Sequence, residues 1–309
     1  MNSSTSKMPA QTELPKRSLF DEEGYLQLYP DIAEGVASGA IESGWGHFSQ
    51  NGIAEGRQWI ARQDPYQSVS PVISPHDEMY NANDEHYFRV GESALHCVEV
   101  AIQATRRPRS SIKRILDLPC GHGRAMRFLR KGFPDAELVA CDLNRDGVDF
   151  CAETFDAVPE YSHEDPEQIP HQGVVDLIWC GSLLTHLSEQ KCRDFMRFFD
   201  RILSHQGIVV FTMHGRFCAQ ELTSGPNRHN LTESQVKELL DGYQRDNFSY
   251  VSYDEQSDYG FSLAHPSFVV GSLIGDMNWR VVGYHETGWD NRQDVVCLQK
   301  SLHGSALGI

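Results

Sequence analysis

The chain has 309 residues, of which 40% are hydrophobic and 23% are charged, and its formal net charge is −16. This composition is typical of a soluble globular protein with one large domain and a small module. The acidic balance argues against nucleic acid or an anionic membrane as the main partner, because both are held by Lys and Arg. No apolar run of about 18 residues occurs, so we predict no membrane span.

The start of the chain, residues 1–20, is polar and lacks the apolar segment of a signal peptide. The eight cysteines include no Cys-x-x-Cys pair, and several lie in apolar strand patterns. Reduced, buried thiols in a cytoplasmic protein are the expected result. The histidines are scattered without the spacing of metal ligands, so we predict no metal site.

Residues 1–18 are predicted to be a disordered tail and residues 61–75, rich in Pro, Ser and Gln, a linker. Between them, residues 19–60 contain short helical patterns separated by Gly and Pro around a few aromatic residues. This stretch contains Phe20-Asp21, Tyr25-Leu26, Pro30-Asp31-Ile32-Ala33, His47-Phe48 and Gly52-Ile53-Ala54-Glu55-Gly56-Arg57. It resembles a short module of bacterial glycosyltransferases and surface-associated proteins. The resemblance implies a helical docking piece for a protein partner, without chemistry of its own.

Residues 84–105 have apolar residues at helical spacing on one face and are predicted to form a helix. Residues 115–118 then form a short buried strand that leads into a turn with glycines at 121 and 123, followed by a helical pattern over residues 125–131. Glycine lets the backbone bend sharply and lie against a ligand, and the N–H groups of the next helix favour an electron-rich group. The segment therefore predicts a nucleotide-binding turn.

Asp117 distinguishes this turn from a dinucleotide site, which usually has an apolar residue there and a third glycine where this chain has Met126. A carboxylate suits a cationic ligand with hydroxyl groups better than a pyrophosphate. The run Asp117-Leu118-Pro119-Cys120-Gly121-His122-Gly123 resembles the first motif of class I S-adenosylmethionine-dependent methyltransferases, Asp/Glu-x-Gly-x-Gly-x-Gly, with proline in the first glycine position. The resemblance implies S-adenosylmethionine as the cofactor, held by Asp117, Pro119, Cys120, Gly121 and Gly123.

Residues 137–142 form a second apolar strand that ends in an acid, Asp142. An acid at this place can accept hydrogen bonds from both hydroxyls of a ribose. We expect Asp142 and the following Leu143 to contact the cofactor. In the alternative, Asp142 caps the helix that begins near Arg145.

Asp165 precedes an Ile-Pro pair, and the resemblance implies a place beside the adenine amino group; a solvated acidic loop is the alternative. Residues 174–180 form the next strand. Its carboxyl end faces the ligand crevice, because ligands lie at the carboxyl ends of the strands in open parallel sheets. Cys180 and Ser182 are expected to complete the cofactor site. His186 is either a packed histidine or a catalytic base.

A helix over residues 188–203 and a strand over residues 207–212 follow, and this strand ends beside His214. Successive strand–helix units with right-handed crossovers predict a parallel sheet between two helical layers. We therefore predict a class I methyltransferase domain over residues 76–302, an α/β Rossmann-like three-layer sandwich with a mostly parallel seven-stranded sheet. Residues 216–263, with one helix near 232–243, are predicted to form a lid-like insertion.

Residues 265–277 look helical, and residues 279–286 and 295–299 look like strands joined by a loop over 287–294. If the last strand returns antiparallel, as in the resembled fold, this loop lies at the cofactor edge. Gly288-Trp289-Asp290-Asn291-Arg292-Gln293-Asp294 resembles a Gly-Trp-Asp-Asn-His-Gln-Asp-Val sequence of bacterial proteins that modify glycans, with Arg292 in place of the histidine. A structural turn held by Asp290 and Asn291 is an equal alternative.

These patterns predict a methyltransferase that acts on a small-molecule or glycan acceptor, with O-methylation of a sugar as the expected reaction. A sugar hydroxyl requires a base at the crevice, and the candidates are His214, His186 and Asp294. Two other hypotheses remain. One is an NAD-dependent or nucleotide-sugar oxidoreductase, and the other is a non-catalytic cofactor-binding adaptor in a glycan assembly machine.

Overall fold

The computed structural model describes residues 14, 17, 20–59, 68–225, 227–254, 258–275 and 277–301. The chain divides into two compact units, residues 1–68 and 69–309. The boundary falls inside the predicted linker. Residues 61–67 of that linker and most of the predicted tail lie outside the described residues. All eight cysteines are buried and none forms a disulfide. None of the helices described is long and apolar enough to cross a membrane.

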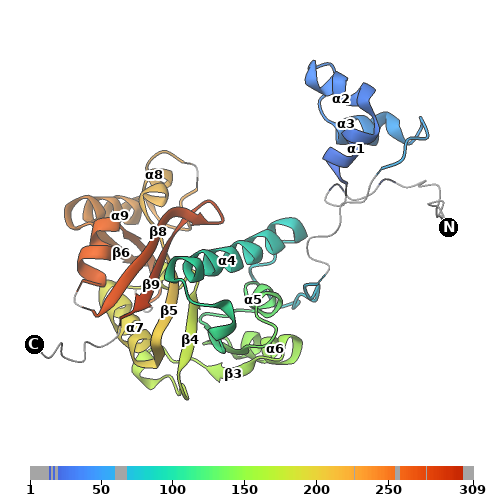
Figure 1. The fold of residues 1–309 in the computed structure, drawn as a ribbon. Coiled ribbons are helices and arrows are strands. Elements are labelled where there is room, and N and C mark those ends of the chain that lie inside the picture. The colour runs from blue at the N-terminus through green and yellow to red at the C-terminus, as the bar shows by residue number, and fades with distance from the viewer. Residues whose placement is uncertain are drawn as a thin grey trace, which may run out of the picture. The chain divides into compact units, whose positions relative to one another are not determined.

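The N-terminal unit is helical, as predicted (Figure 1). Helices α1 (Glu22–Leu28), α2 (Pro30–Ala37) and α3 (Gly44–His47) are followed by a π-helical turn, Phe48–Gly52. They enclose a small core of Phe20, Tyr25, Ile32 and Phe48. The carboxylate of Glu22 accepts hydrogen bonds from the backbone N–H groups of Gly44 and Trp45, which ties α1 to the start of α3.

The second unit is built on a seven-stranded sheet with the order β3-β2-β1-β4-β5-β9-β8. Its strands are β1 (Arg114–Asp117), β2 (Glu137–Asp142), β3 (Val158–Tyr161), β4 (Val175–Cys180), β5 (Leu203–Met213), β8 (Trp279–Trp289) and β9 (Gln293–Lys300). The first five are parallel, and β9 is antiparallel to both of its neighbours. This arrangement confirms the predicted fold class, including the returning last strand.

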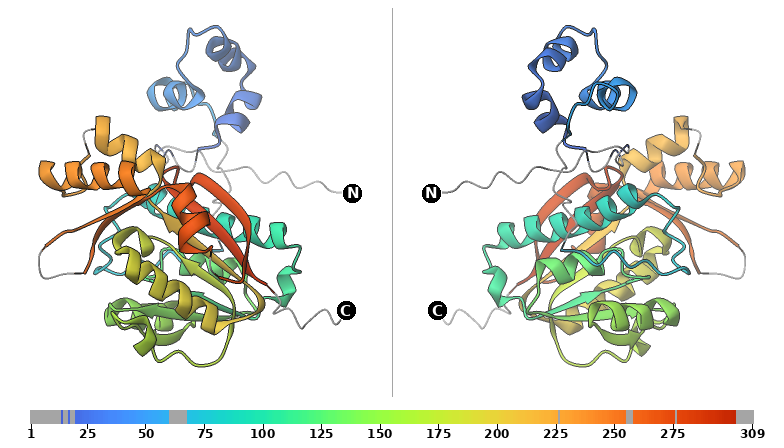
Figure 2. Two further views of the ribbon diagram at one scale, coloured as in Figure 1. Left: turned by 90° about the vertical axis from the view of Figure 1, so that its left-hand side faces the viewer. Right: turned by 90° about the vertical axis from the view of Figure 1, so that its right-hand side faces the viewer.

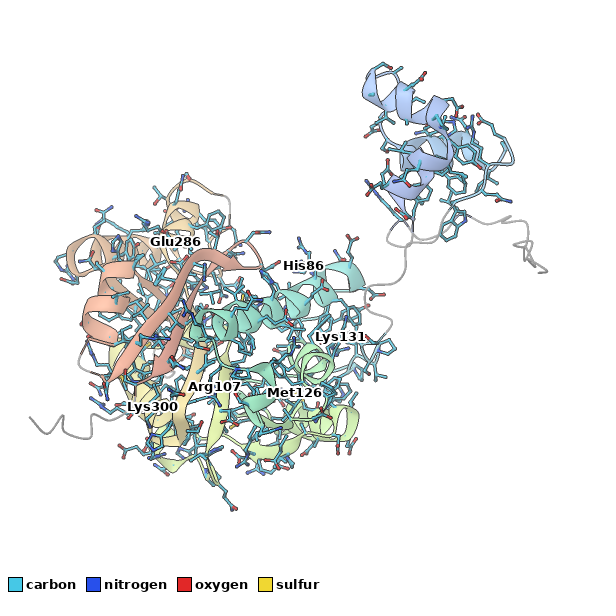
Figure 3. The ribbon with its side chains drawn as sticks, in the orientation of Figure 1. His86, Arg107, Met126, Lys131, Glu286 and Lys300 are labelled. Carbon is cyan, nitrogen blue, oxygen red and sulfur yellow. The ribbon has the colours of Figure 1, made fainter. Side chains whose placement is uncertain are left out.

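Helices cover both faces of the sheet (Figures 1 and 2). Helix α4 (Asp84–Thr105) contacts α5 (Met126–Gly132), which contacts α6 (Arg145–Phe155), and these three lie on one face. Helix α7 (Glu189–Ile202) covers the other face, where its Met196 and Phe199 are fully buried against the strands. Figure 3 shows how side chains fill the space between these layers and the sheet.

The segment after β5 is richer in structure than the sequence predicted. It contains α8 (Arg216–Ser224), α9 (Glu233–Asp246) and a two-stranded sheet of β6 (Phe248–Ser252) and β7 (Gly260–Ala264), whereas one helix was expected. These elements share a separate small core that includes Leu222, Leu239, Phe261 and Leu263. We refer to residues 216–264 as the insertion.

Two predicted elements near the end of the chain need correction. The helix expected over residues 265–277 is reduced to α10 (Pro266–Phe268) and a π-helical turn, Val269–Leu273, in a stretch whose glycines at 271 and 275 disfavour a longer helix. The loop expected over residues 287–294 is a tight hairpin, because β8 continues to Trp289. Asp290 and Asn291 adopt the left-handed φ angles, 51° and 55°, that such turns require.

Candidate functional site

The turn after β1 is held between the two neighbouring strands. The backbone N–H of Leu118 donates to the carbonyl of Trp179 on β4, and that of Cys120 donates to the carbonyl of Cys141 on β2. Gly121 and Gly123 both have left-handed φ angles, +50° and +79°. A Cβ atom on Gly123 would overlap the Phe155 ring of α6, whereas one on Gly121 would meet nothing within 4 Å. The predicted turn is therefore confirmed, with a packing role at Gly123 and a purely conformational one at Gly121.

Asp142 fixes this turn from the end of β2. Its Oδ2 accepts a hydrogen bond of 2.8 Å from the Gly121 N–H, and its Oδ1 accepts one of 2.9 Å from the Asn144 N–H. The side chain that caps α6 belongs to Asn144, which accepts from the Gly147 N–H. Asp142 is thus not the cap considered above, and its carboxylate retains lone pairs for a ligand.

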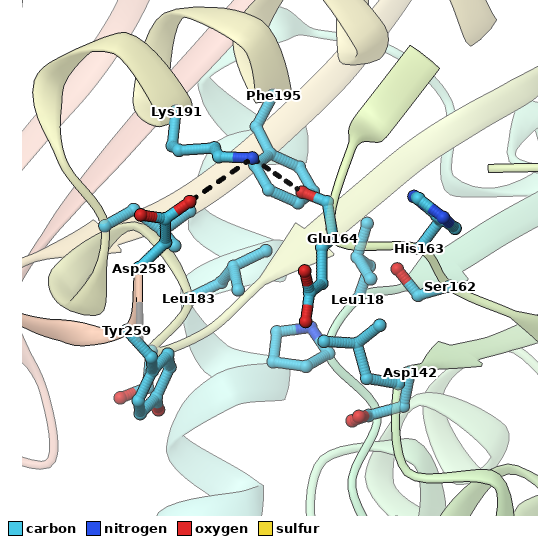
Figure 4. A pocket seen from close by; sticks show the side chains of 14 residues that line it. Leu118, Asp142, Ser162, His163, Glu164, Leu183, Lys191, Phe195, Asp258 and Tyr259 are labelled. Carbon is cyan, nitrogen blue, oxygen red and sulfur yellow. Dashed lines mark hydrogen bonds and ion pairs between the residues drawn. The ribbon is translucent and has the colours of Figure 1, made fainter. Parts of the chain in front are cut away.

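A cavity of about 560 Å³ opens at the carboxyl ends of β1, β2 and β4, and we call it the large cavity (Figure 4). Four of the predicted cofactor residues line it: Pro119, Asp142, Leu143 and Ser182. The other lining residues are Leu118, Ser162, His163, Glu164, Leu183, Leu187, Lys191, Phe195, Asp258 and Tyr259. The last two come from the insertion, so the large cavity is closed on one side by residues that follow β5.

Asp117 is almost fully buried beside the turn, with 1% of its surface exposed. Neither carboxylate oxygen has a hydrogen-bond partner in the part of the chain that the structure describes. Burial, with a contribution from the Asp142 charge, raises the pKa of Asp117 well above its ordinary value. An unpartnered buried carboxylate is costly, and a cationic group bound next to it would offset that cost.

The remaining predicted cofactor residues do not reach the large cavity. Cys180 is fully buried in the main core, and Cys120 is a buried thiol whose pKa is raised by its neighbour Cys151 and by burial. The carboxylate of Asp165 accepts hydrogen bonds from the Glu167 N–H and the Gln168 side chain, so it caps a short turn. Glu164, one residue earlier, lines the large cavity, whereas Asp165 does not (Figure 4).

Lys191 of α7 bridges two parts of the rim of the large cavity (Figure 4). Its Nζ donates a hydrogen bond of 3.2 Å to the Glu164 carbonyl and lies 4.0 Å from Oδ2 of Asp258. The loop after β3 and the insertion are thereby joined through one side chain.

A second cavity, of about 310 Å³, adjoins the first at Ser182, and we call it the histidine cavity. Its other lining residues are Met79, Val90, Arg124, His186, His214, His229, Asn230, Tyr253, Phe261, Trp289, Asp290, Arg292 and Gln293. The predicted residues His186 and His214 therefore lie in one cavity, next to the end of β4. Among the residues described, no three His, Cys, Asp or Glu side chains are placed to hold a metal ion.

Ser182 stands where the two cavities meet and is held in an uncommon conformation, with φ at +59°. Its N–H donates to the Thr212 hydroxyl at 2.8 Å, and its own hydroxyl accepts from the Gln293 amide at 3.1 Å. The Thr212 hydroxyl in turn donates to the Gln293 side-chain oxygen at 2.6 Å. A left-handed serine costs roughly 1 kcal/mol, and this closed set of hydrogen bonds holds it there.

The hydrogen bonds of the two predicted histidines fix which ring nitrogen carries the proton. Nδ1 of His186 lies 2.8 Å from the Gly260 carbonyl, and Nδ1 of His214 lies 3.3 Å from the Ser262 carbonyl. A carbonyl only accepts, so Nδ1 is protonated and Nε2 of each neutral ring has a free lone pair. Burial lowers the pKa of both rings, most strongly that of His214, so both are neutral and able to accept a proton.

Asp294, the third predicted base, lines neither cavity. It is fully buried and accepts hydrogen bonds from the Tyr284 hydroxyl at 2.9 Å and the Thr287 N–H at 3.0 Å. Its carboxylate also packs against Gly215. These contacts hold the β8–β9 hairpin onto the end of β5, so the structure gives Asp294 a structural role.

Three residues of the histidine cavity were missed as site residues by the sequence reasoning: Arg124, His229 and Arg292. Arg292 donates to Oε2 of Glu221 at 2.7 Å and to Nε2 of His229 at 2.6 Å. Arg124 directly follows Gly123, which was a usable signal, and Arg292 occupies the histidine position of the resembled hairpin sequence. His229 lies in the insertion, and no local sequence pattern indicates its place in the cavity.

Comparison with known proteins finds similarity over part of the second unit. Residues 115–207 match a family model described as a methyltransferase domain. A fatty-acid O-methyltransferase of Mycolicibacterium smegmatis is 36% identical over 59 residues, which are 19% of this chain and 22% of that protein. The matched segment thus spans about a fifth of that relative.

Two solved structures illustrate the similarity of fold. A S-adenosylmethionine-dependent methyltransferase from Clostridium acetobutylicum is 14% identical, covers 74% of this chain and 96% of its own, and has a TM-score of 0.48. An O-methyltransferase family protein from Burkholderia thailandensis is 14% identical and has a TM-score of 0.42. The match covers 68% of this chain and 57% of that protein.

The matched domain, the sheet and the large cavity are consistent with one cofactor. The unpartnered carboxylate of Asp117 suits an ammonium group, and Asp142 suits the hydroxyls of a ribose. The match of residues 115–207 to a methyltransferase domain supports the predicted cofactor, S-adenosylmethionine, and disfavours the oxidoreductase hypothesis.

Proposed function

We propose that the protein transfers the methyl group of S-adenosylmethionine to a hydroxyl oxygen of a small molecule or glycan, with a sugar hydroxyl as the first candidate. The observation that supports this most is the junction of the two cavities at Ser182, with neutral histidines on the far side. The cofactor occupies the large cavity and the acceptor occupies the histidine cavity, and the insertion covers both as a lid.

In this proposal three acids in or beside the large cavity have separate tasks. Asp142 accepts from the ribose hydroxyls while it holds the turn, and Asp117 faces the ammonium group of the cofactor. Glu164 takes the place expected of Asp165 near the adenine. When bound, S-adenosylmethionine supplies a methyl group on a positively charged sulfur. The chain's contribution is to direct that methyl group at the junction, since positioning supplies much of the rate of such reactions.

The acceptor hydroxyl must lose its proton as its oxygen bonds to the methyl carbon and the carbon–sulfur bond breaks. Nε2 of His186 or His214 accepts that proton, and the imidazolium then returns it to water. The products are a methyl ether and S-adenosylhomocysteine. Two neutral bases in one cavity also distinguish this proposal from the adaptor hypothesis, for which a catalytic base has no purpose.

The N-terminal unit is proposed to dock to a protein partner, because its helices enclose a core of their own. We place the protein in the cytoplasm on the strength of its eight buried thiols.

Calorimetric titration tests the cofactor half of the proposal. S-adenosylmethionine and S-adenosylhomocysteine are expected to bind and NAD is not. Asp142→Asn keeps one acceptor oxygen for the turn but removes the charge, and it should weaken binding about tenfold, the value of one charged hydrogen bond. Asp149→Asn, which removes a surface acid bonded to Tyr161, is the matched control and should leave affinity unchanged.

Release of S-adenosylhomocysteine in the presence of sugars, phenols and hydroxy acids tests the transfer half. Turnover with any hydroxyl acceptor supports the proposal. Binding of NAD instead of S-adenosylmethionine would refute it, as would cofactor binding without turnover on the full acceptor panel.

A further inference from the structure

Among the described residues that line the histidine cavity, one arginine forms no ion pair. Arg292 is neutralised by Glu221 at 2.7 Å. Asp290 lies 3.4 Å from Arg89 and 3.9 Å from His86. Once these groups are paired, Arg124 is left over.

The structure shows no hydrogen bond or ion pair from the Arg124 guanidinium to any of the residues described, although this group lines the cavity. Its carbon atom lies 5.7 Å from the centre of the Trp289 ring. Trp289 is itself fixed, because its indole N–H donates to the Val90 carbonyl at 3.1 Å and its ring packs edge-on against Trp179. The guanidinium therefore rests on a rigid aromatic surface with its N–H donors unused.

Burial also affects this group, since it lowers the pKa of Arg124. The charges of Asp77 and Asp290 partly oppose this shift, but neither carboxylate forms an ion pair with Arg124. A guanidinium removed from water without an ion-paired carboxylate destabilises the free protein, and an anion bound beside it would recover that free energy. The other charged groups that line the cavity are already paired, Arg292 with Glu221 and Asp290 with Arg89. The three histidines have lowered pKa values and are neutral, and Asn230 and Gln293 are amides.

We propose that the acceptor carries an anionic group, a carboxylate or a phosphate, which Arg124 binds while a hydroxyl of the same molecule is methylated at the histidines. This inference rests on the proposed function and narrows its substrate class. The planar guanidinium matches both anions with two parallel hydrogen bonds. A cavity of about 310 Å³ with walls of Phe261, Tyr253 and Trp289 suits a sugar acid, a sugar phosphate or an aromatic hydroxy acid.

Arg124 lies next to the cofactor turn in the chain, so the proposed anion site is close to the cofactor. It follows Gly123 of the cofactor turn and precedes α5, so one short segment contacts both ligands. An anion held there lies on the acceptor side of the junction and orients the rest of the acceptor toward Ser182 and the histidines.

The test compares each acid with its neutral counterpart. Hydroxy acids are assayed beside their amides, and sugar phosphates beside the free sugars, with wild type, Arg124→Met and Arg124→Lys. Loss of a charged hydrogen bond predicts that Arg124→Met lowers kcat/KM for the acids by about tenfold or more. The value for the neutral counterparts should stay within about twofold of wild type, and Arg124→Lys should recover part of the loss. Arg197→Met removes an exposed arginine of α7 and is the matched control.

The outcomes separate this inference from the proposed function. If wild type methylates neutral acceptors as well as their acids, or Arg124→Met affects both equally, the inference fails while the methyltransferase proposal stands. If no acceptor turns over, binding decides: the complex with S-adenosylhomocysteine is titrated with hydroxybenzoate, its amide and inorganic phosphate. If neither anion binds more tightly than the amide, the inference is overturned. It is also overturned if Arg124→Met leaves the binding of the anions unchanged. Comparing the affinity for hydroxybenzoate with that for inorganic phosphate shows whether the site binds a carboxylate or a phosphate.

Discussion

The two cavities of this protein are assembled in different ways. All but two residues of the large cavity come from residues 118–195, at the ends of consecutive parallel strands, and the turn that forms its floor is held by backbone hydrogen bonds. The histidine cavity gathers residues from 79 to 293, and its groups are held mainly by side chains, as in the Ser182, Thr212 and Gln293 set. A parallel sheet thus dictates the place of a cofactor, whereas the acceptor site depends on what is added around the sheet.

Among the changes that test this difference between the two cavities, the largest loss of activity is expected on replacing His214. Replacing His214 with Ala should lower kcat by roughly 10²- to 10⁴-fold, the usual contribution of a general base, with little change in affinity for S-adenosylhomocysteine. His214 stacks on Phe261, so Ala also leaves a gap, and His214→Gln, which fills most of it, should lose as much activity.

His186→Gln serves as the companion variant, because both rings present Nε2 and only one is required as the base. Full turnover in either histidine variant assigns the base to the other ring. Full turnover in both would show that the histidine cavity does not perform the acid–base step. Kinetics with saturating cofactor, combined with calorimetry, separates these cases.

A destabilising change is expected at the turn of the large cavity. Gly123→Ala should reduce the free energy of unfolding by roughly 2–4 kcal/mol, since overpacking costs about 1–3 kcal/mol and a left-handed alanine about 1 more. Gly121→Ala adds only the conformational cost, about 1 kcal/mol, because its Cβ meets nothing. Urea unfolding of both variants measures the difference. Equal losses would mean that the Phe155 ring of α6 moves aside.

The same contrast explains what the sequence could predict. Helix α4 has the predicted bounds, Asp84–Thr105, and β2 has the predicted bounds, Glu137–Asp142, because caps and apolar periodicity are local signals. The fold and four lining residues of the large cavity followed from strand ends and the turn. Glu164 lines the large cavity and Asp165 does not, because Asp165 is the carboxylate that caps the short turn, and the sequence pattern does not distinguish the two.

The histidine cavity could be predicted only in part. His186 and His214 follow strands and were therefore found. Asp294 was placed at the correct edge of the sheet, but its side chain faces Tyr284 and the Thr287 backbone, and no local pattern reveals that. The sequence did not predict β6, β7 or the place of His229. The insertion is held together by contacts between its own residues, and these residues lie far apart in the chain.

The pH dependence of stability offers an intermediate test. His186 and His214 have pKa values lowered by burial, so below the ordinary value of 6.5 the unfolded chain binds protons that the folded chain does not. Their contribution is therefore complete above pH 6.5 and is lost as the pH falls, by up to about 1.4 kcal/mol per pH unit for each ring. Urea unfolding at pH 7.5 and 5.5 should show a smaller loss in His214→Gln than in wild type. An equal loss would indicate that His214 is protonated in the folded state.

The smallest effect is expected at Lys191, whose side chain joins the loop after β3 to the insertion across the large cavity. Its partner Asp258 is 87% exposed, and exposed ion pairs contribute only about 0.2–1 kcal/mol, so Lys191→Met should weaken cofactor binding by no more than about fivefold. The difference should shrink at high salt, which screens exposed charges. Lys237→Met, which removes a similar pair with Asp241 on α9, is the control. A larger loss that persists at high salt would show that the insertion is part of the cofactor site, and the contrast between a sheet-built and an insertion-built cavity would no longer hold.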